Sequence, residues 1–205
     1  YVTCRYVACV ADTGVLDEAV PFLDAPVLQP DEHEAYMEPS VSKDSAPLLD
    51  HLYRAIDRSL KYGAHGLPLM GTGDWNDGMN RVGAGGQGES VWLGFFLYAV
   101  LRQFSELAQR HDDPYFAERC SSESARLRDA IEHSSWDGAW YRRAWFDDGS
   151  PLGTSTNAEC RIDSIAQSWS VLSGAGNAQR SCTAMDAVDT QLVRRDAALI
   201  QLLDP

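Results

Sequence analysis

Apolar residues recur along most of this chain at the spacing of amphipathic helices, and few stretches alternate as half-buried strands do. One such helix is predicted between Ser45 and Gly63, because its apolar residues would share one face. They are Leu49, Leu52, Tyr53, Ile56 and Leu60. Ser45 is the predicted N-cap, Pro47 fits the first turn, and Gly63 is the predicted stop.

Further helices are predicted over most of the remaining chain. They cover residues 2–10, about 89–111, 114 to about 134, about 162–172 and about 178–193, and a last one begins within 196–203. The helix that starts near residue 89 is at first apolar nearly all round, which predicts deep burial. Helices of this length joined by long loops favour a barrel of helix pairs over a βαβ fold. The predicted fold class is therefore all-α.

Three segments are predicted to be non-helical. Residues 139–146 are rich in Trp, Tyr and Phe, which suggests a short β-hairpin arm that reaches a turn at residues 147–149. Residues 26–44 are polar and contain several prolines, so a long ordered loop is expected there. Residues 83–88 match the G-x-G-x-x-G pattern of dinucleotide-binding loops, but no hydrophobic strand precedes them and no βαβ unit surrounds them. A flexible lip beside a site is the preferred interpretation.

Composition narrows the function classes. The chain has 205 residues, of which 44% are hydrophobic and 10% aromatic, as in a globular protein. Its net charge of −13 argues against a nucleic-acid partner, which would select a basic surface. Five cysteines are an odd number without a C-x-x-C pair, so reduced thiols in a reducing compartment are expected. The histidines and cysteines lack metal-ligand spacing, and no metal site is predicted.

Residues 71–81, GTGDWNDGMNR, concentrate the candidate chemistry. Carboxylates can handle protons and hydroxyl groups, carboxamides can bind hydroxyl groups, and an indole can pack on a pyranose face. Glycines let the backbone turn sharply and approach a ligand closely. The segment therefore suggests a sugar site. The alternative is an Asp/Asn/Gly turn that only caps a helix.

The residues around this segment strengthen the sugar interpretation. Residues 65–70 are HGLPLM and residues 88–93 are GESVWL. Together with residues 71–81, they closely resemble the phosphorylase-like region of cyclic β-1,2-glucan synthases. More broadly, they resemble the inverting sugar phosphorylases of the cellobiose and chitobiose phosphorylase type, glycoside hydrolase family ninety-four. Matches to the same family at residues 13–23 and 140–169 extend the resemblance over nearly the whole chain.

The resemblance implies an (α/α)6 barrel, of which the predicted helices would make about half. In the family, the second Asp of the D-W-N-D motif is the general acid, and it corresponds to Asp77. Substrate-binding roles are implied for Asp74, Trp75, Asn76 and Gln167. Two alternatives stay open: Asp74 could form only an Asx-turn or a helix cap, and Gln167 could make only hydrogen bonds between helices.

The activity implied by the resemblance is reversible phosphorolysis of a β-linked glucan to α-glucose 1-phosphate and a shortened glucan. Inorganic phosphate would be the co-substrate, and no cofactor is expected. Residues 1–205 would be a partial barrel domain of a longer polypeptide, a glycosyltransferase of the phosphorylase type, and would be inactive alone. The family's phosphate donors lie outside the matched residues. Inverting glycoside hydrolysis therefore stays open, as does a non-catalytic carbohydrate-binding or scaffold role.

The predicted partners are a β-glucan oligosaccharide, inorganic phosphate and the rest of the parent polypeptide, with no nucleic acid. The longest apolar run, residues 91–101, is too short to cross a bilayer, so no membrane contact is expected from this segment. The expected location is the cytoplasm. The resemblance leaves room for a parent that is anchored in the bacterial inner membrane.

Overall fold

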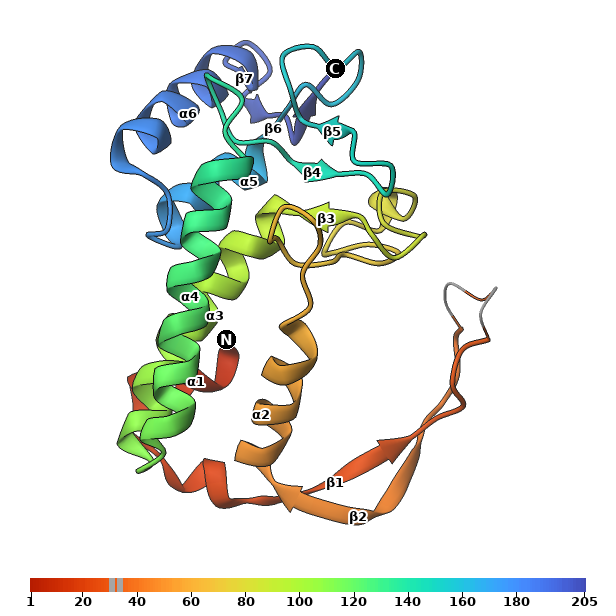
Figure 1. Ribbon diagram of the computed structural model, residues 1–205, viewed down its shortest axis with the longest axis vertical. Helices are drawn as coiled ribbons and strands as arrows, with labels where there is room; N and C mark the ends of the chain where they lie inside the picture. Colours follow the sequence, from red (N-terminus) through yellow and green to blue (C-terminus); the bar gives the residue numbers. More distant parts are fainter. Residues whose placement is uncertain (30–31, 33–34) are drawn as a thin grey trace. The chain divides into compact units, whose positions relative to one another are not determined.

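The computed structural model describes residues 1–29, 32 and 35–205. They form two compact units, Tyr1–Leu60 and Lys61–Pro205 (Figure 1). The described residues contain six α-helices, joined by loops and short antiparallel strands. The predicted all-α class is confirmed only in part: helices are the main regular structure of the described residues, but strands accompany them. The prediction of one hairpin as its only β structure is wrong, because strands also occur elsewhere in both units.

The first unit joins helices α1 and α2 through a long β-hairpin. Helix α1 covers Val2–Val10, as predicted, and α2 covers Leu48–Ser59. Between them, β1 (Ala19–Asp24) pairs antiparallel with β2 (Ser40–Pro47) and forms an extended arm (Figure 1). Part of the predicted 26–44 loop is therefore strand, although residues 30, 31, 33 and 34 lie outside the described residues.

Helix α2 begins later than predicted. Ser45 is paired with Pro21 in the strand ladder, so it cannot serve as the N-cap, and Pro47 takes that position instead. The helix ends at Ser59, before the predicted stop at Gly63. Its predicted apolar face is confirmed: Leu49 and Ile56 are buried within it.

The second unit is built on two long helices that lie side by side (Figure 1). Helix α3 covers Val91–Arg110, and Ser90 caps it by accepting the Leu93 N–H. Helix α4 covers Pro114–Ser134, as predicted, with Asp113 as its cap. Their shared apolar faces form the core. The most deeply buried side chains there are Phe95, Leu101, Phe104, Leu127 and Ile131.

Two shorter helices complete the second unit. Helix α5 covers Ser164–Leu172 and α6 covers Ala178–Gln191, close to the predicted ranges. Both are capped by side chains: Asp163 accepts the N–H groups at the start of α5, and Asn177 does so for α6. Gly174 follows α5 with φ of 71°, in the left-handed region that glycine tolerates.

Short strands connect these helices. A three-stranded sheet is formed by β3 (Glu89–Ser90), β4 (Ala144–Trp145) and β5 (Pro151–Leu152). The predicted hairpin is confirmed in part: its first strand lies within 139–146, and its second follows the turn at residues 147–149.

The helix predicted within 196–203 is wrong. That region instead forms β8 (Leu199–Ile200), which pairs with β7 (Val193–Arg194), and β9 (Leu203–Asp204), which pairs with β6 (Ile162–Asp163). Ala198 has φ of 52°, which is incompatible with a continuing right-handed helix. A local hairpin and one long-range strand pair thus replace the predicted helix.

Replacing Gly88 by alanine is expected to destabilise the second unit by about 1–3 kcal/mol, the usual cost of overpacking. A Cβ at this position would lie 2.4 Å from the Val82 carbonyl oxygen and 2.4 Å from the Gly83 Cα, and backbone atoms cannot give way easily. Urea unfolding of the purified chain measures the change. The control is Gly94→Ala in α3, where the nearest atoms lie at 3.4 Å or more. Equal midpoints for both variants would contradict the expectation.

Candidate functional site

Asp74 anchors the loop at residues 71–81 to the interior of the second unit. The side chains of Asp74 and Arg143 are fully buried and form a two-pronged ion pair, with Nη1–Oδ2 at 2.7 Å and Nη2–Oδ1 at 2.8 Å. The Ser90 hydroxyl donates to Asp74 Oδ2 at 2.7 Å, and the Asn76 N–H donates to Oδ1 at 3.1 Å. Paired Arg–carboxylate bonds are among the stronger hydrogen bonds in proteins, so the start of the loop is firmly held.

Arg143 also faces a second buried carboxylate. Its Nε lies 3.3 Å from Asp163 Oδ2, and these two side chains are 0% and 1% exposed. Asp163 caps α5, since its Oδ1 accepts the Ile165 N–H at 2.7 Å. Arg143 therefore links the 71–81 loop to the first turn of α5. A buried cation between two carboxylates offsets part of the cost of removing each from water.

Asp74 is the more acidic of the two carboxyl groups in this cluster. Burial alone would raise the pKa of Asp74, but the hydrogen bonds and charge of Arg143, with the Ser90 hydroxyl, outweigh it and hold the pKa below its usual value. At Asp163, burial dominates and raises the pKa despite the neighbouring Arg143. Asp74 is therefore ionised at neutral pH. Because its side chain is buried and both of its oxygens accept hydrogen bonds inside the protein, Asp74 suits an anchor and not a general acid.

Asp77 occupies a very different environment three residues later. It begins the short 3-10 turn η2, Asp77–Met79, which Asn76 caps by accepting the Gly78 N–H at 2.9 Å. The residue is exposed, and its carboxylate makes no hydrogen bond or ion pair within the described part of the chain. Its backbone is thus held by its neighbours while its carboxyl group is available to a ligand.

Trp75 lies between these two carboxylates in the sequence and exposes part of its aromatic ring to solvent. Its side chain is 46% exposed, and its edge meets Trp92 at a centroid distance of 6.5 Å. Behind it, Trp92 stacks on Phe96 at 5.5 Å, and Trp169 meets Phe96 edge-on at 5.3 Å. An exposed indole backed by packed aromatic rings can offer a firm apolar face to a pyranose ring.

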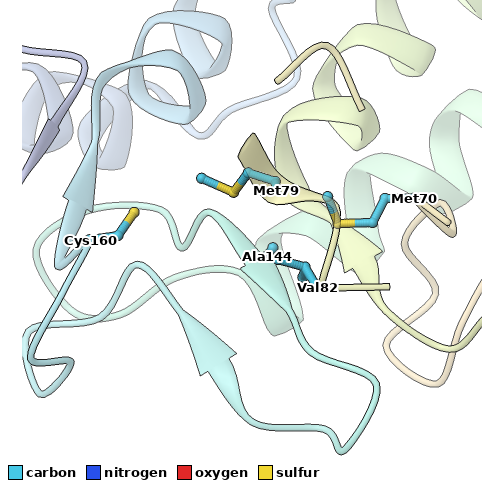
Figure 2. Close-up of a cluster of buried hydrophobic side chains, with 5 residues drawn as sticks. All are labelled: Met70, Met79, Val82, Ala144 and Cys160. Atoms are coloured by element: carbon cyan, nitrogen blue, oxygen red, sulfur yellow. The ribbon is translucent and has the colours of Figure 1, made fainter. Parts of the chain in front are cut away.

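An apolar cluster holds the loop from its other side. Met70, Met79 and Val82 come from the loop and its two ends, and they gather around Ala144 of β4 and Cys160 (Figure 2). Phe146, Leu152 and Leu203 pack against this cluster. The loop is therefore fixed by both a buried ion pair and a small hydrophobic core. Such double anchoring suits a loop whose carboxyl group must be placed accurately.

The segment before the loop is held by Glu89, which is 1% exposed. Its carboxylate accepts the His65 N–H at 3.1 Å and the Leu67 N–H at 2.9 Å, and it also contacts His65 Nδ1. The His65 ring stacks on Trp145 of β4 at 3.8 Å. Glu89 thus orders the approach to the loop from within the protein.

The glycine-rich segment at residues 83–88 binds the carboxylate of Asp147, a residue of the same chain. The N–H groups of Gly85, Gln87 and Gly88 donate to the Asp147 carboxylate at 2.7, 2.8 and 2.9 Å. Burial would raise the pKa of Asp147, but these three bonds together outweigh it and lower the pKa. The segment is therefore tied to the β4–β5 turn, which differs from the predicted flexible lip.

Gln167 lies in the interior, 0% exposed, on α5. Its Oε1 accepts the Tyr141 N–H at 2.8 Å, and its Nε2 donates to the carbonyl oxygens of Tyr141 and Asp163 at 2.8 Å each. Its hydrogen-bonding groups are thus engaged within the protein. The bonds to Tyr141 join α5 to the segment before β4, and not to another helix as the alternative interpretation of the sequence had it.

Sequence reasoning missed the groups that hold the loop: Arg143, Ser90 and Asp163. One signal for Arg143 was present, because it lies within the aromatic run at residues 140–146 that β4 shares. An arginine that is buried among aromatic residues requires acidic partners. Which carboxylates they are could not be read from the sequence, because Asp74 is 69 positions away.

The chain matches a known protein family. Residues 3–205 match the family model described as "Glycosyl hydrolase 94 superfamily, catalytic domain". The chain therefore belongs to this family, as the resemblance in its sequence predicted.

Individual relatives agree with the family. The chain is 44% identical, over its whole length, to the cyclic beta-(1,2)-glucan synthase NdvB of Rhizobium meliloti (strain 1021), of which it spans 7%. Over 73% of its length it is 37% identical to the 3-O-beta-D-glucopyranosyl-beta-D-glucuronide phosphorylase of Paenibacillus borealis, of which it spans 20%. Over 91% it is 32% identical to the solabiose phosphorylase of the same organism, of which it spans 22%. The chain thus covers a minor part of each relative.

Two further findings concern the described residues as a whole. None of their helices combines the length and apolar character that a membrane crossing requires. No group of three or more His, Cys, Asp or Glu side chains among them is arranged to hold a metal ion.

Proposed function

We propose that this chain supplies the general acid of an inverting, phosphorylase-like domain that cleaves β-linked glucans, and that Asp77 is this acid. The observation that carries the proposal is the contrast between two carboxylates in one loop. Asp74 is buried and paired with Arg143, whereas Asp77 is exposed and makes no hydrogen bond or ion pair within the described residues. The membership in the glycosyl hydrolase 94 superfamily supports the same assignment.

The proposed reaction is phosphorolysis. As the glycosidic C–O bond breaks, Asp77 donates a proton to the departing oxygen, so the shortened glucan leaves as an alcohol. Inorganic phosphate attacks the anomeric carbon from the opposite face, which inverts its configuration and yields α-glucose 1-phosphate. Because phosphate is already an anionic nucleophile, no second carboxylate is needed to activate water, unlike in an inverting hydrolase.

The other predicted site residues take different roles in this proposal. Trp75, with its open indole face, is proposed to stack on a sugar ring. Asp74, Asn76 and Gln167 were predicted to bind substrate. The Asp74 carboxylate, the Asn76 side-chain oxygen and the Gln167 carboxamide are engaged in hydrogen bonds inside the protein. For these three, we propose that holding the loop and its surroundings is the main contribution, and a direct sugar contact stays a prediction.

The proposal extends to a longer polypeptide. The phosphorylase relatives named above are about five times longer than the matched part of this chain, as the shares of 20% and 22% imply. We propose that the helices of this chain form about half of an (α/α)6 barrel, and that phosphate donors come from the rest of the parent. The parent is expected to work in the cytoplasm, where reduced thiols persist.

Turnover of a β-1,2-linked glucooligosaccharide by the full-length polypeptide is expected to require inorganic phosphate or arsenate. The physical reason is that this loop offers one available carboxyl group, which serves as the acid. With no second carboxylate of the loop available to activate water, the nucleophile must be an anion from solution. Proton NMR during the reaction measures both the product and its anomeric configuration, which should be α. The 205-residue chain alone, assayed in the same buffer, should release no sugar phosphate.

Equal rates in phosphate-free buffer, with free glucose as the product, would move the assignment to an inverting glycoside hydrolase. No turnover of any β-glucoside in either buffer would favour a non-catalytic carbohydrate-binding role. Phosphorolysis by the 205-residue chain alone would show that the phosphate donors lie within it.

A further inference from the structure

Arg143 joins three segments: the β4 sheet, the 71–81 loop and the start of α5. Its backbone is fixed next to β4, since its N–H donates to the Leu152 carbonyl at 2.8 Å and its own carbonyl accepts the Val91 N–H at 3.2 Å. From there, its side chain reaches Asp74 in the loop and Asp163 at the start of α5. One residue thus connects the sheet, the loop and the helix.

The space around Arg143 leaves it little freedom. Its side chain is fully buried, and Nη1 also donates to the Ser90 hydroxyl at 3.2 Å. Gly153 lies so close that a Cβ there would be 2.4 Å from the Arg143 backbone nitrogen, so the backbone is also tightly packed at this point. A buried side chain whose two Nη atoms are both hydrogen-bonded links the position of the sheet to the carboxylate that it binds.

We propose that Arg143 is a positioning residue for the reaction, and that through Asp74 it sets the place of the Asp77 carboxyl group. This inference rests on the proposed role of Asp77. The connection is short: the Asp74 carboxylate accepts the Asn76 N–H, and the Asn76 side chain caps the turn that begins at Asp77. A shift of Asp74 is therefore passed along the backbone to Asp77.

The size of the effect follows from the geometry of proton transfer. A general acid must come within about 2.6–3.2 Å of the atom it protonates. A displacement of about 1 Å can cost on the order of a hundredfold in rate. Arg143 is suited to prevent such a displacement because its planar fork binds both oxygens of one carboxylate, which a lysine cannot do.

The test compares Arg143→Lys with Arg142→Lys in the full-length polypeptide. Arg142 is a matched control, because it is the neighbouring arginine and pairs with Asp137 instead of with the loop. Two substrates are used, each with phosphate: a β-1,2-linked glucooligosaccharide, whose leaving group needs a proton, and 2,4-dinitrophenyl β-glucoside, whose leaving group does not.

Arg143→Lys should lower kcat on the oligosaccharide on the order of a hundredfold, and on the dinitrophenyl glucoside by less than about fivefold, since no proton is needed there. KM should change little on either substrate. Arg142→Lys should stay within about twofold on both, because Arg142 binds Ser134 and Asp137 and, among the described residues, makes no hydrogen bond or ion pair to the loop. An equal loss on both substrates would show a general structural role and would overturn the inference, as would wild-type kcat on the oligosaccharide.

Amide hydrogen exchange provides a readout that is independent of activity. In Arg143→Lys, peptides from residues 71–81 should exchange faster, while α4 should keep its protection. Unchanged exchange in residues 71–81 would overturn the inference even if activity falls. If wild-type protein shows no phosphorolysis, the proposed function fails, and the exchange result still decides whether Arg143 holds the loop.

A second variant covers the case in which Arg143→Lys does not fold. Asp74→Asn breaks the same ion pair from the other side with a side chain of equal size. Its kcat should fall by at least about tenfold on the oligosaccharide and by less on the dinitrophenyl glucoside, as for Arg143→Lys. Full activity of Asp74→Asn on the oligosaccharide would overturn the inference.

Discussion

Replacing Asp77 by asparagine in the full-length polypeptide is expected to lower turnover of β-linked glucooligosaccharides by about two to four orders of magnitude, the usual contribution of general acid–base catalysis. Asparagine keeps the size of the side chain but has no acidic proton to give. Stability should change by no more than about 0.5 kcal/mol, because Asp77 is exposed and holds no described partner. Steady-state kinetics with phosphate and thermal unfolding of the same preparations measure the two quantities.

Asp74→Asn provides the comparison within the same loop. It should lose less activity than Asp77→Asn but more stability, because it leaves Arg143 with one fewer buried partner. Near-wild-type turnover by Asp77→Asn on a substrate with a poor leaving group would exclude Asp77 as the acid. A larger loss of activity in Asp74→Asn than in Asp77→Asn would mean that the two roles are reversed.

Replacing Arg143 by methionine is expected to destabilise the second unit by about 3–5 kcal/mol, the cost of removing one partner of a buried ion pair. Methionine fills much of the same space but leaves the carboxylates of Asp74 and Asp163 buried without their cation. Domains have a net stability of about 5–15 kcal/mol, so this loss is a large fraction of the total. Urea unfolding followed by far-UV circular dichroism measures it.

Arg161→Met is the matched control for this measurement. The Arg161 side chain is 44% exposed and lies 3.3 Å from Asp204, so its ion pair is worth about 0–1 kcal/mol. Equal unfolding midpoints for Arg143→Met and Arg161→Met would contradict the view that the buried cluster holds this unit together. A loss confined to Arg143→Met would support it.

Much of the helical structure was predictable because its determinants are local. The helix predicted from residue 114 to about 134 has these bounds in α4, whose prolyl first residue and Asp113 cap lie together in the sequence. The same reasoning failed at Ser45, because a residue that can cap a helix can also pair in a strand. It failed again beyond residue 196, where β8 turns back on the neighbouring β7 and β9 pairs with the distant β6.

The candidate site was also predictable only in part. The motif at residues 71–81 marks the loop as a candidate sugar site, since carboxylates and carboxamides can bind hydroxyl groups and an indole can pack on a sugar ring. The resemblance to a known family, which the comparisons confirmed, pointed to Asp77. Neither could show that Asp74 is an anchor, because that depends on which cation reaches it.

The sequence by itself determined most of the helices and the chemistry collected in one loop, because these depend on residues within a few positions of one another. The tertiary structure decided which carboxylate is buried and which is exposed. Arg143 is 69 positions from Asp74, and Asp147 is 62 positions from Gly85, and only the folded chain brings each pair together. Charges this far apart in the sequence pair only after the backbone between them has folded, so their contacts depend on the topology of the whole unit.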